Sequence, residues 1–122
     1  VMEYTEPVVR EFLSSVVSEA LADNKPDMSV EYAQGRFVKT APVTVVCTWP
    51  LPSGDGKTVR SKEFVVAFSG DAVVAFVEAD EARLARLRVA AIEYIRATRQ
   101  PFDPADQGLV YPYLCQIDYL GV

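Results

Sequence analysis

The sequence predicts an α+β fold in which an antiparallel sheet of four to five strands carries two helices packed on one face. Two observations lead to this prediction. Apolar residues recur at helical spacing in residues 5–24 and 80–99, and they alternate with polar residues in segments between and after these two. The expected order is α-β-β-β, then a short helix or strand, then α-β. A length of 122 residues, with 50% hydrophobic and 24% charged side chains, is typical of a single domain over residues 1–122.

The first helix is expected to begin after Thr5, an N-cap residue that precedes an acid and a proline in the first turn. The sequence Asn24-Lys25-Pro26 ends it, because proline restricts the residue before it to extended backbone. The apolar residues form one stripe, which we expect to pack against the sheet. They are Val9, Phe12, Leu13, Val16, Val17, Ala20 and Leu21.

Strand patterns cover residues 28–33, 43–49 and 59–68, and a last strand is expected over residues 113–119. Residues 50–57 are rich in proline and glycine, which indicates a loop.

Residues 70–78 allow two interpretations. Gly70-Asp71 suits a two-residue hairpin turn, which would make residues 72–77 a fourth strand. Ser69 or Asp71 as an N-cap would instead begin a short helix.

Residues 80–99 form the clearest helix, with acids in the first turn and Arg96 and Arg99 in the last, as the helix dipole favours. Arg86, Glu93 and Arg96 mark its outer face. We expect this face to be solvated and to carry pairs such as Glu93 with Arg96, or to meet the acidic first helix within the chain or across a dimer. The inner face comprises Leu84, Leu87, Ala91, Tyr94, Ile95 and Thr98.

The chain contains no histidine, which removes Ser-His-Asp and Cys-His catalysis and His-containing zinc sites. The carboxylates within residues 71–81 could serve acid–base chemistry or bind Mg²⁺, but the helix dipole explains acids at a helix N-terminus more simply. Residues 53–58 end in the Gly-Lys-Thr of a phosphate-binding loop, yet Leu51 stands where that loop needs glycine and a strand pattern follows. We therefore expect no catalytic residue, cofactor or metal ligand.

The net charge of −5 is concentrated at the N-terminal end. Residues 1–35 hold seven acids and two bases, whereas the remaining residues hold ten of each. An acidic surface disfavours nucleic acid and anionic membranes. It either solubilises the domain or docks a basic partner, with Glu11 and Glu19 as candidate contacts.

Cys47 and Cys115 each lie in an apolar stretch, which is typical of buried free thiols in a cytosolic protein. With Met2 as the natural start, Glu3 and Glu6 stand where a signal peptide would carry bases. No apolar run reaches the ~18 residues that span a bilayer. These observations favour a cytoplasmic location.

Aromatic residues stand beside prolines at strand ends, notably Trp49, Tyr111 and Tyr113. Such rings either close the end of a core or line a partner-binding groove. Together with Glu11 and Glu19, they are the candidate partner-binding residues.

Three stretches resemble a family of small bacterial proteins of unknown function: residues 64–69 leading to Asp71, the Arg- and Ala-rich helix after Asp80, and the closing Tyr111-Pro112-Tyr113 strand. The resemblance covers residues 28–119, implies a helix from Gly70 onward and brings no catalytic or binding residues. The element order and the acidity are also similar to those of class I secretion chaperones, which are small acidic dimers with the order α-β-β-β-α-β-β-α. This chain shows α-β-β-β-α-β and departs from that order by lacking its last strand and helix.

We therefore expect a noncatalytic interaction or accessory domain of a bacterial cytoplasmic protein. Its partner would be another protein or a second copy of the chain, and neither nucleic acid nor a membrane. The alternatives are a secretion-chaperone-like dimer that binds a partner protein and an enzyme that uses carboxylates alone.

Overall fold

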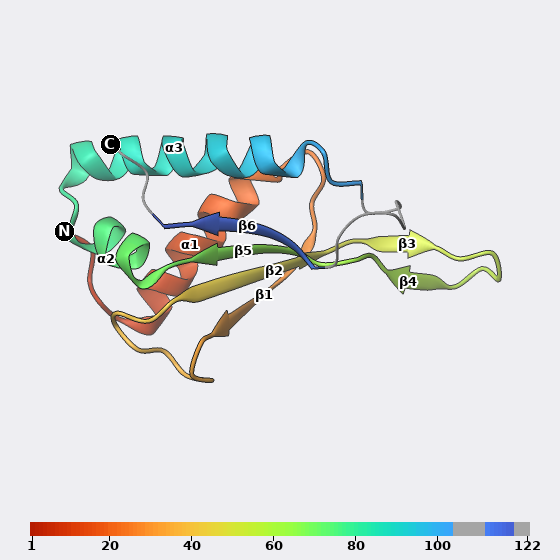
Figure 1. The fold of residues 1–122 in the computed structure, drawn as a ribbon, viewed down its shortest axis with the longest axis horizontal. Coiled ribbons are helices and arrows are strands. Elements are labelled where there is room, and N and C mark those ends of the chain that lie inside the picture. The colour runs from red at the N-terminus through yellow and green to blue at the C-terminus, as the bar shows by residue number, and fades with distance from the viewer. Residues whose placement is uncertain (104–111, 119–122) are drawn as a thin grey trace.

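A computed structural model describes residues 1–103 and 112–118 and confirms the α+β class. Its main sheet has the order β1-β2-β5-β6, formed by Asp27–Tyr32, Val43–Thr48, Phe64–Phe68 and Tyr113–Ile117. The β1–β2 and β2–β5 pairs are antiparallel, as expected. The β5–β6 pair is parallel, so the sheet is mixed rather than wholly antiparallel. Two helices separate β5 from β6 in the chain and return it to the same end of the sheet, and such a crossover produces parallel strands (Figure 1).

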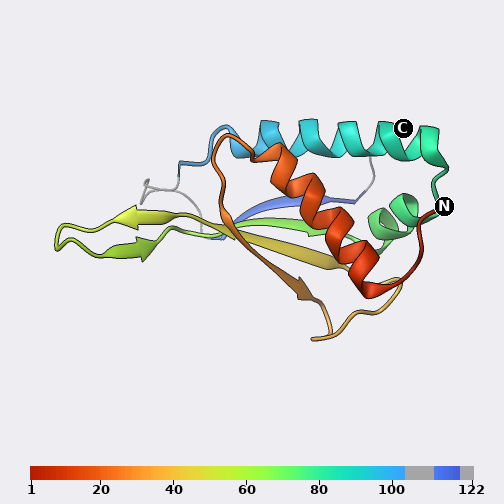
Figure 2. The same cartoon turned by 180° about the vertical axis from the view of Figure 1, so that it is seen from behind.

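The helices α1 (Glu6–Ala20) and α3 (Glu81–Arg99) lie on one face of the main sheet, as Figures 1 and 2 show from opposite sides. Residues 70–78, which allowed two interpretations, form a third helix, α2 (Gly70–Glu78). The Ser69 hydroxyl caps α2 by accepting a hydrogen bond from the Ala72 N–H at 3.1 Å. Asp80 caps α3 in the same way, through the Arg83 N–H at 2.8 Å.

Most residues of both predicted apolar stripes are buried, which confirms that the two long helices pack on the sheet, although the expectation that Tyr94 lies on the inner face was wrong. The stripe of α1 and the inner face of α3 meet Phe64, Val66 and Phe68 of β5 in one core. The buried helix residues are Val9, Leu13, Val16, Val17 and Ala20 in α1 and Leu87, Ala91, Ile92 and Ile95 in α3. Phe12 and Leu84 are partly buried against this core, while Tyr94 is 46% exposed.

A separate two-stranded hairpin, β3 (Pro50–Pro52) and β4 (Thr58–Arg60), projects from one end of the main sheet (Figure 1). The sequence predicted a loop over residues 50–57 and one continuous strand over residues 59–68, and both expectations were wrong here. Residues 61–63 divide the expected strand, and the prolines of β3 are tolerated because a two-stranded ribbon consists only of edge strands.

The Gly-Lys-Thr sequence spans the turn of this hairpin and the first residue of β4. The Ser53 N–H donates to the Lys57 carbonyl at 2.8 Å, and Gly56 adopts a φ of 81°, which suits glycine. Strand β4 begins at Thr58, so no helix follows Lys57 to present its N–H groups to a phosphate. This segment is a polar hairpin turn.

Candidate functional site

The face of the main sheet opposite α1 and α3 bears no helix from the part of the chain that the structure describes, and Figure 1 looks onto it. The strand registers align outward-pointing residues in rows across the four strands. One row runs Ser29, Val46, Val65, Leu114, and the next runs Glu31, Thr44, Ala67, Gln116. We call the surface formed by these eight residues the open face.

An apolar line crosses the centre of the open face. Val46 on β2, which is only 9% exposed, is opposite Val65 on β5, and Val65 is opposite Leu114 on the edge strand β6. Leu114 is 54% exposed, and its outward position on a strand with Cys115 and Ile117 buried beneath it explains why. The solvated side of a sheet usually carries polar residues, and exposed apolar groups there are typical of interaction surfaces.

Carboxylates surround this line. Glu31 belongs to the open face itself, while Asp27, Glu63 and Asp118 lie around it. The position of Asp118 follows from the hydrogen bond that it accepts from the Gln116 side chain at 2.9 Å. Arg60 lies among them and pairs with Asp27, so acids outnumber bases among these described residues.

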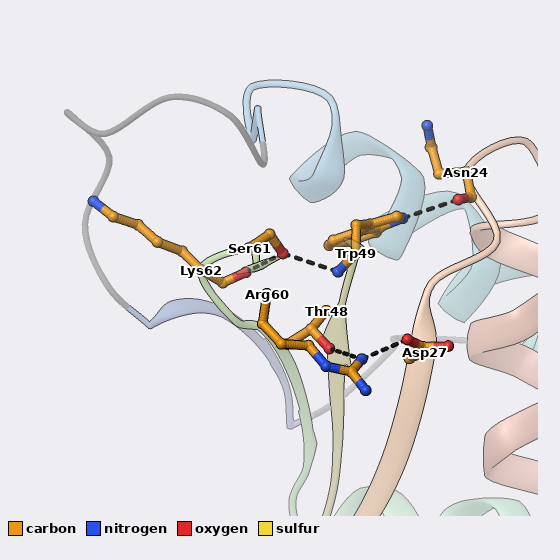
Figure 3. Close-up of polar contacts among 7 residues, drawn as sticks. All are labelled: Asn24, Asp27, Thr48, Trp49, Arg60, Ser61 and Lys62. Carbon is orange, nitrogen blue, oxygen red and sulfur yellow. Dashed lines mark hydrogen bonds and ion pairs between the residues drawn. The ribbon is translucent and has the colours of Figure 1, made fainter. Parts of the chain in front are cut away.

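A hollow of about 300 Å³ lies where the open face meets the foot of the hairpin. Arg60 of β4 forms its wall by pairing with Asp27 of β1 and donating to the Thr48 hydroxyl at 3.1 Å (Figure 3). A second hollow, of about 270 Å³, lies beside Arg60 and includes Val59. The residues that line the first are Asp27, Met28, Ser29, Val46, Thr48, Arg60 and Glu63.

A buried set of hydrogen bonds fixes the hairpin against the main sheet. The Trp49 N–H donates to the Ser61 hydroxyl at 2.9 Å (Figure 3). The Ser61 N–H donates in return to the Trp49 carbonyl at 2.9 Å. The Trp49 indole N–H donates to the Asn24 carbonyl at 3.0 Å, which ties this junction to the end of α1. These bonds hold both strands of the hairpin where they leave the sheet.

The predicted partner-binding aromatics lie at the end of the core rather than on the open face. Trp49 is only 7% exposed, and its ring lies against Phe102 with the Arg99 guanidinium 4.9 Å from its centroid. Tyr113 is half-buried, and its ring stacks on Phe64 with centroids 5.9 Å apart. Packing in the core therefore explains the positions of both rings. The third predicted aromatic, Tyr111, lies outside the described residues.

The predicted acidic contacts on α1 have different surroundings. Glu19 forms an ion pair with Arg88 of α3, and Arg88 also donates to the Ser15 hydroxyl at 3.1 Å. Arg96 donates to the Glu19 and Ala20 carbonyls at the end of α1, at 3.2 and 3.3 Å. Part of the basic helix α3 therefore meets the acidic helix α1 within the chain, which was one of the arrangements expected from the sequence.

Glu11 is exposed beside a shallow apolar hollow on α1. Neither Glu11 nor Glu19 belongs to the open face.

The two cysteines are free and buried on the core side of the sheet. Burial raises the pKa of the Cys47 thiol to about 12, with a smaller effect from Cys115, and burial raises the pKa of Cys115 to about 11. Both are therefore neutral thiols at physiological pH and poor nucleophiles. Within residues 1–103 and 112–118, no three acidic or cysteine side chains are grouped to hold a metal ion.

Comparison of the chain with protein-family models, curated proteins and solved structures gave no match. No helix of the described part is long and apolar enough to cross a membrane.

Sequence reasoning missed the open face, although part of its signal is visible. Leu114 alternates with the buried Cys115 and stands in an outward position that usually takes a polar residue. Arg60 and Asp27 lie 33 positions apart, and nothing local predicts that they pair.

Proposed function

We propose that this chain is a noncatalytic interaction domain of a bacterial cytoplasmic protein, and that its open face binds an extended, basic segment of another protein. The observation that carries the proposal is the apolar line of Val46, Val65 and Leu114 inside a border of carboxylates. The buried neutral thiols, which suit a reducing compartment, support the cytoplasmic location.

The partner's chemistry follows from this surface. Apolar side chains of the partner would cover Leu114 and Val65, because covering exposed apolar area is favourable. Lysine or arginine side chains would approach carboxylates such as Glu31, and complementary charge chiefly raises the rate and specificity of encounter. An extended segment fits because its side chains alternate at the same spacing as those of the strands beneath it.

Peptide display tests the proposal with a defined probe. Random linear peptides are selected on the immobilised wild-type domain, and the enriched peptides are measured by fluorescence anisotropy. We expect enriched sequences to combine basic and apolar residues. Leu114→Asp should weaken their binding by at least about tenfold, because it replaces the most exposed apolar side chain of the line by a charge.

One control variant matches this substitution in exposure. Val89 on α3 is 54% exposed, as Leu114 is. Val89→Asp should leave the affinity within about twofold, since Val89 does not belong to the apolar line. No enrichment, or equal binding by Leu114→Asp and wild type, would overturn the proposal.

A chaperone-like dimer remains the second candidate. One observation favours it, namely the self-complementary outer face of α3 described next. Such a dimer would present two open faces to one partner protein.

A further inference from the structure

The side of α3 turned away from the core carries apolar residues without a cover among the described residues. Val89 at its centre is 54% exposed, next to the small side chains of Ala85 and Ala90. These three residues line a shallow hollow of about 410 Å³ together with Arg86 and Glu93. We call this surface the outer face of α3.

The two charges on this face have opposite signs and symmetric positions. Arg86 lies three residues before Val89, and Glu93 lies three residues after Ala90. Arg86 and Glu93 are seven positions apart, which is about two helical turns or about 10.5 Å along the helix axis. Within the described part of the chain neither forms an ion pair, and Arg96, the expected partner of Glu93, instead bonds the end of α1.

We propose that a second copy of the chain docks on the outer face of α3, with the two α3 helices antiparallel about a two-fold axis between Val89 and Ala90. This arrangement places Arg86 of one protomer opposite Glu93 of its partner, and symmetry forms the same pair twice. Val89 packs on its own copy near the axis, as the self-contact of an isologous interface requires. Ala82, Ala85 and Ala97 are small and exposed, so they let the helices approach closely.

Charge selects this arrangement among the ways to pair the helices. A parallel pair in register would oppose Arg86 to Arg86 and Glu93 to Glu93, and like charges in contact are unfavourable. Only the antiparallel pair opposes unlike charges at both positions. Arg86 and Glu93 therefore make this part of the face complementary to the same face reversed.

A charge-exchange experiment tests this dimer by analytical ultracentrifugation of the whole chain. The series should run from about 1 to 500 µM, since one helix pair buries less than the ~800 Å² per partner of a standard interface and suits a micromolar dissociation constant. Wild type should dimerise over this range. Arg86→Glu and Glu93→Arg should each be monomeric, because each opposes like charges twice.

Recombination of the two variants gives the decisive arm. An equimolar mixture of Arg86→Glu and Glu93→Arg should form a heterodimer, since each acid then faces an arginine. The double variant should recover the homodimer. Loss of folding cannot mimic this recovery, and circular dichroism of each variant checks the helix content.

Val89→Asp should abolish the dimer, whereas Leu114→Asp on the open face should retain it. The dimer and the proposed peptide-binding function can therefore fail separately. A wild-type monomer at the highest concentration, or a mixture that stays monomeric, would overturn the antiparallel dimer.

Discussion

Gly70 shows at the residue scale how a distant contact settles what the local sequence leaves open. A Cβ atom at Gly70 would lie 2.1 Å from the Thr40 carbonyl oxygen, so only glycine allows the loop before β2 to lie against the start of α2. The local pattern permitted a turn or a cap at this position. Thr40 lies 30 positions earlier in the chain, and no periodicity predicts that the two backbones meet.

Gly70→Ala is expected to destabilise the fold by about 1–3 kcal/mol, because the backbone must shift to accept the added carbon. Gly54→Ala is the matched control, since nothing lies within 4 Å of a Cβ atom there, and it should change stability by less than about 0.5 kcal/mol. Urea denaturation followed through the single tryptophan gives both values. Equal midpoints for Gly70→Ala and wild type would show that the close approach to Thr40 is incorrect.

The elements that the sequence predicted best are those that depend on residues close together in the chain. Apolar periodicity located α1 and α3, and Thr5, the predicted N-cap residue, directly precedes the first residue of α1, Glu6. The parallel pairing of β6 and the hairpin strand β3 were not predictable in this way. Strand pairing depends on residues far apart in sequence, and Pro50 and Pro52 argue locally against a strand.

Ser61→Ala tests the junction that joins the hairpin to the sheet. The substitution leaves the buried Trp49 N–H without its acceptor, and an unsatisfied buried donor costs about 1–3 kcal/mol. Ser53→Ala in the exposed hairpin turn removes a hydroxyl with much less effect, below about 0.5 kcal/mol, because water replaces it. Thermal unfolding by circular dichroism compares the two variants. If Ser61→Ala unfolds no earlier than Ser53→Ala, the junction does not hold the hairpin as described.

At the scale of the whole molecule, the proposed function depends on the one-sided packing of helices on the sheet. Alternation along β2, β5 and β6 predicts which residues share a face, but not which face the helices cover. That choice depends on the crossover through α2 and α3. The predicted contacts Trp49 and Tyr113 fell on the covered side, while Leu114 fell on the open one.

Mapping of amide chemical shifts by NMR tests the central claim that the open face is the binding surface. Isotope-labelled protein is titrated with the tightest peptide from the display selection. The largest shifts should fall in Thr44–Thr48, Val65–Ala67 and Tyr113–Gln116, which form adjacent strands of the main sheet. Shifts confined to α1, α3 or the hairpin turn, with these three segments unchanged, would contradict the account.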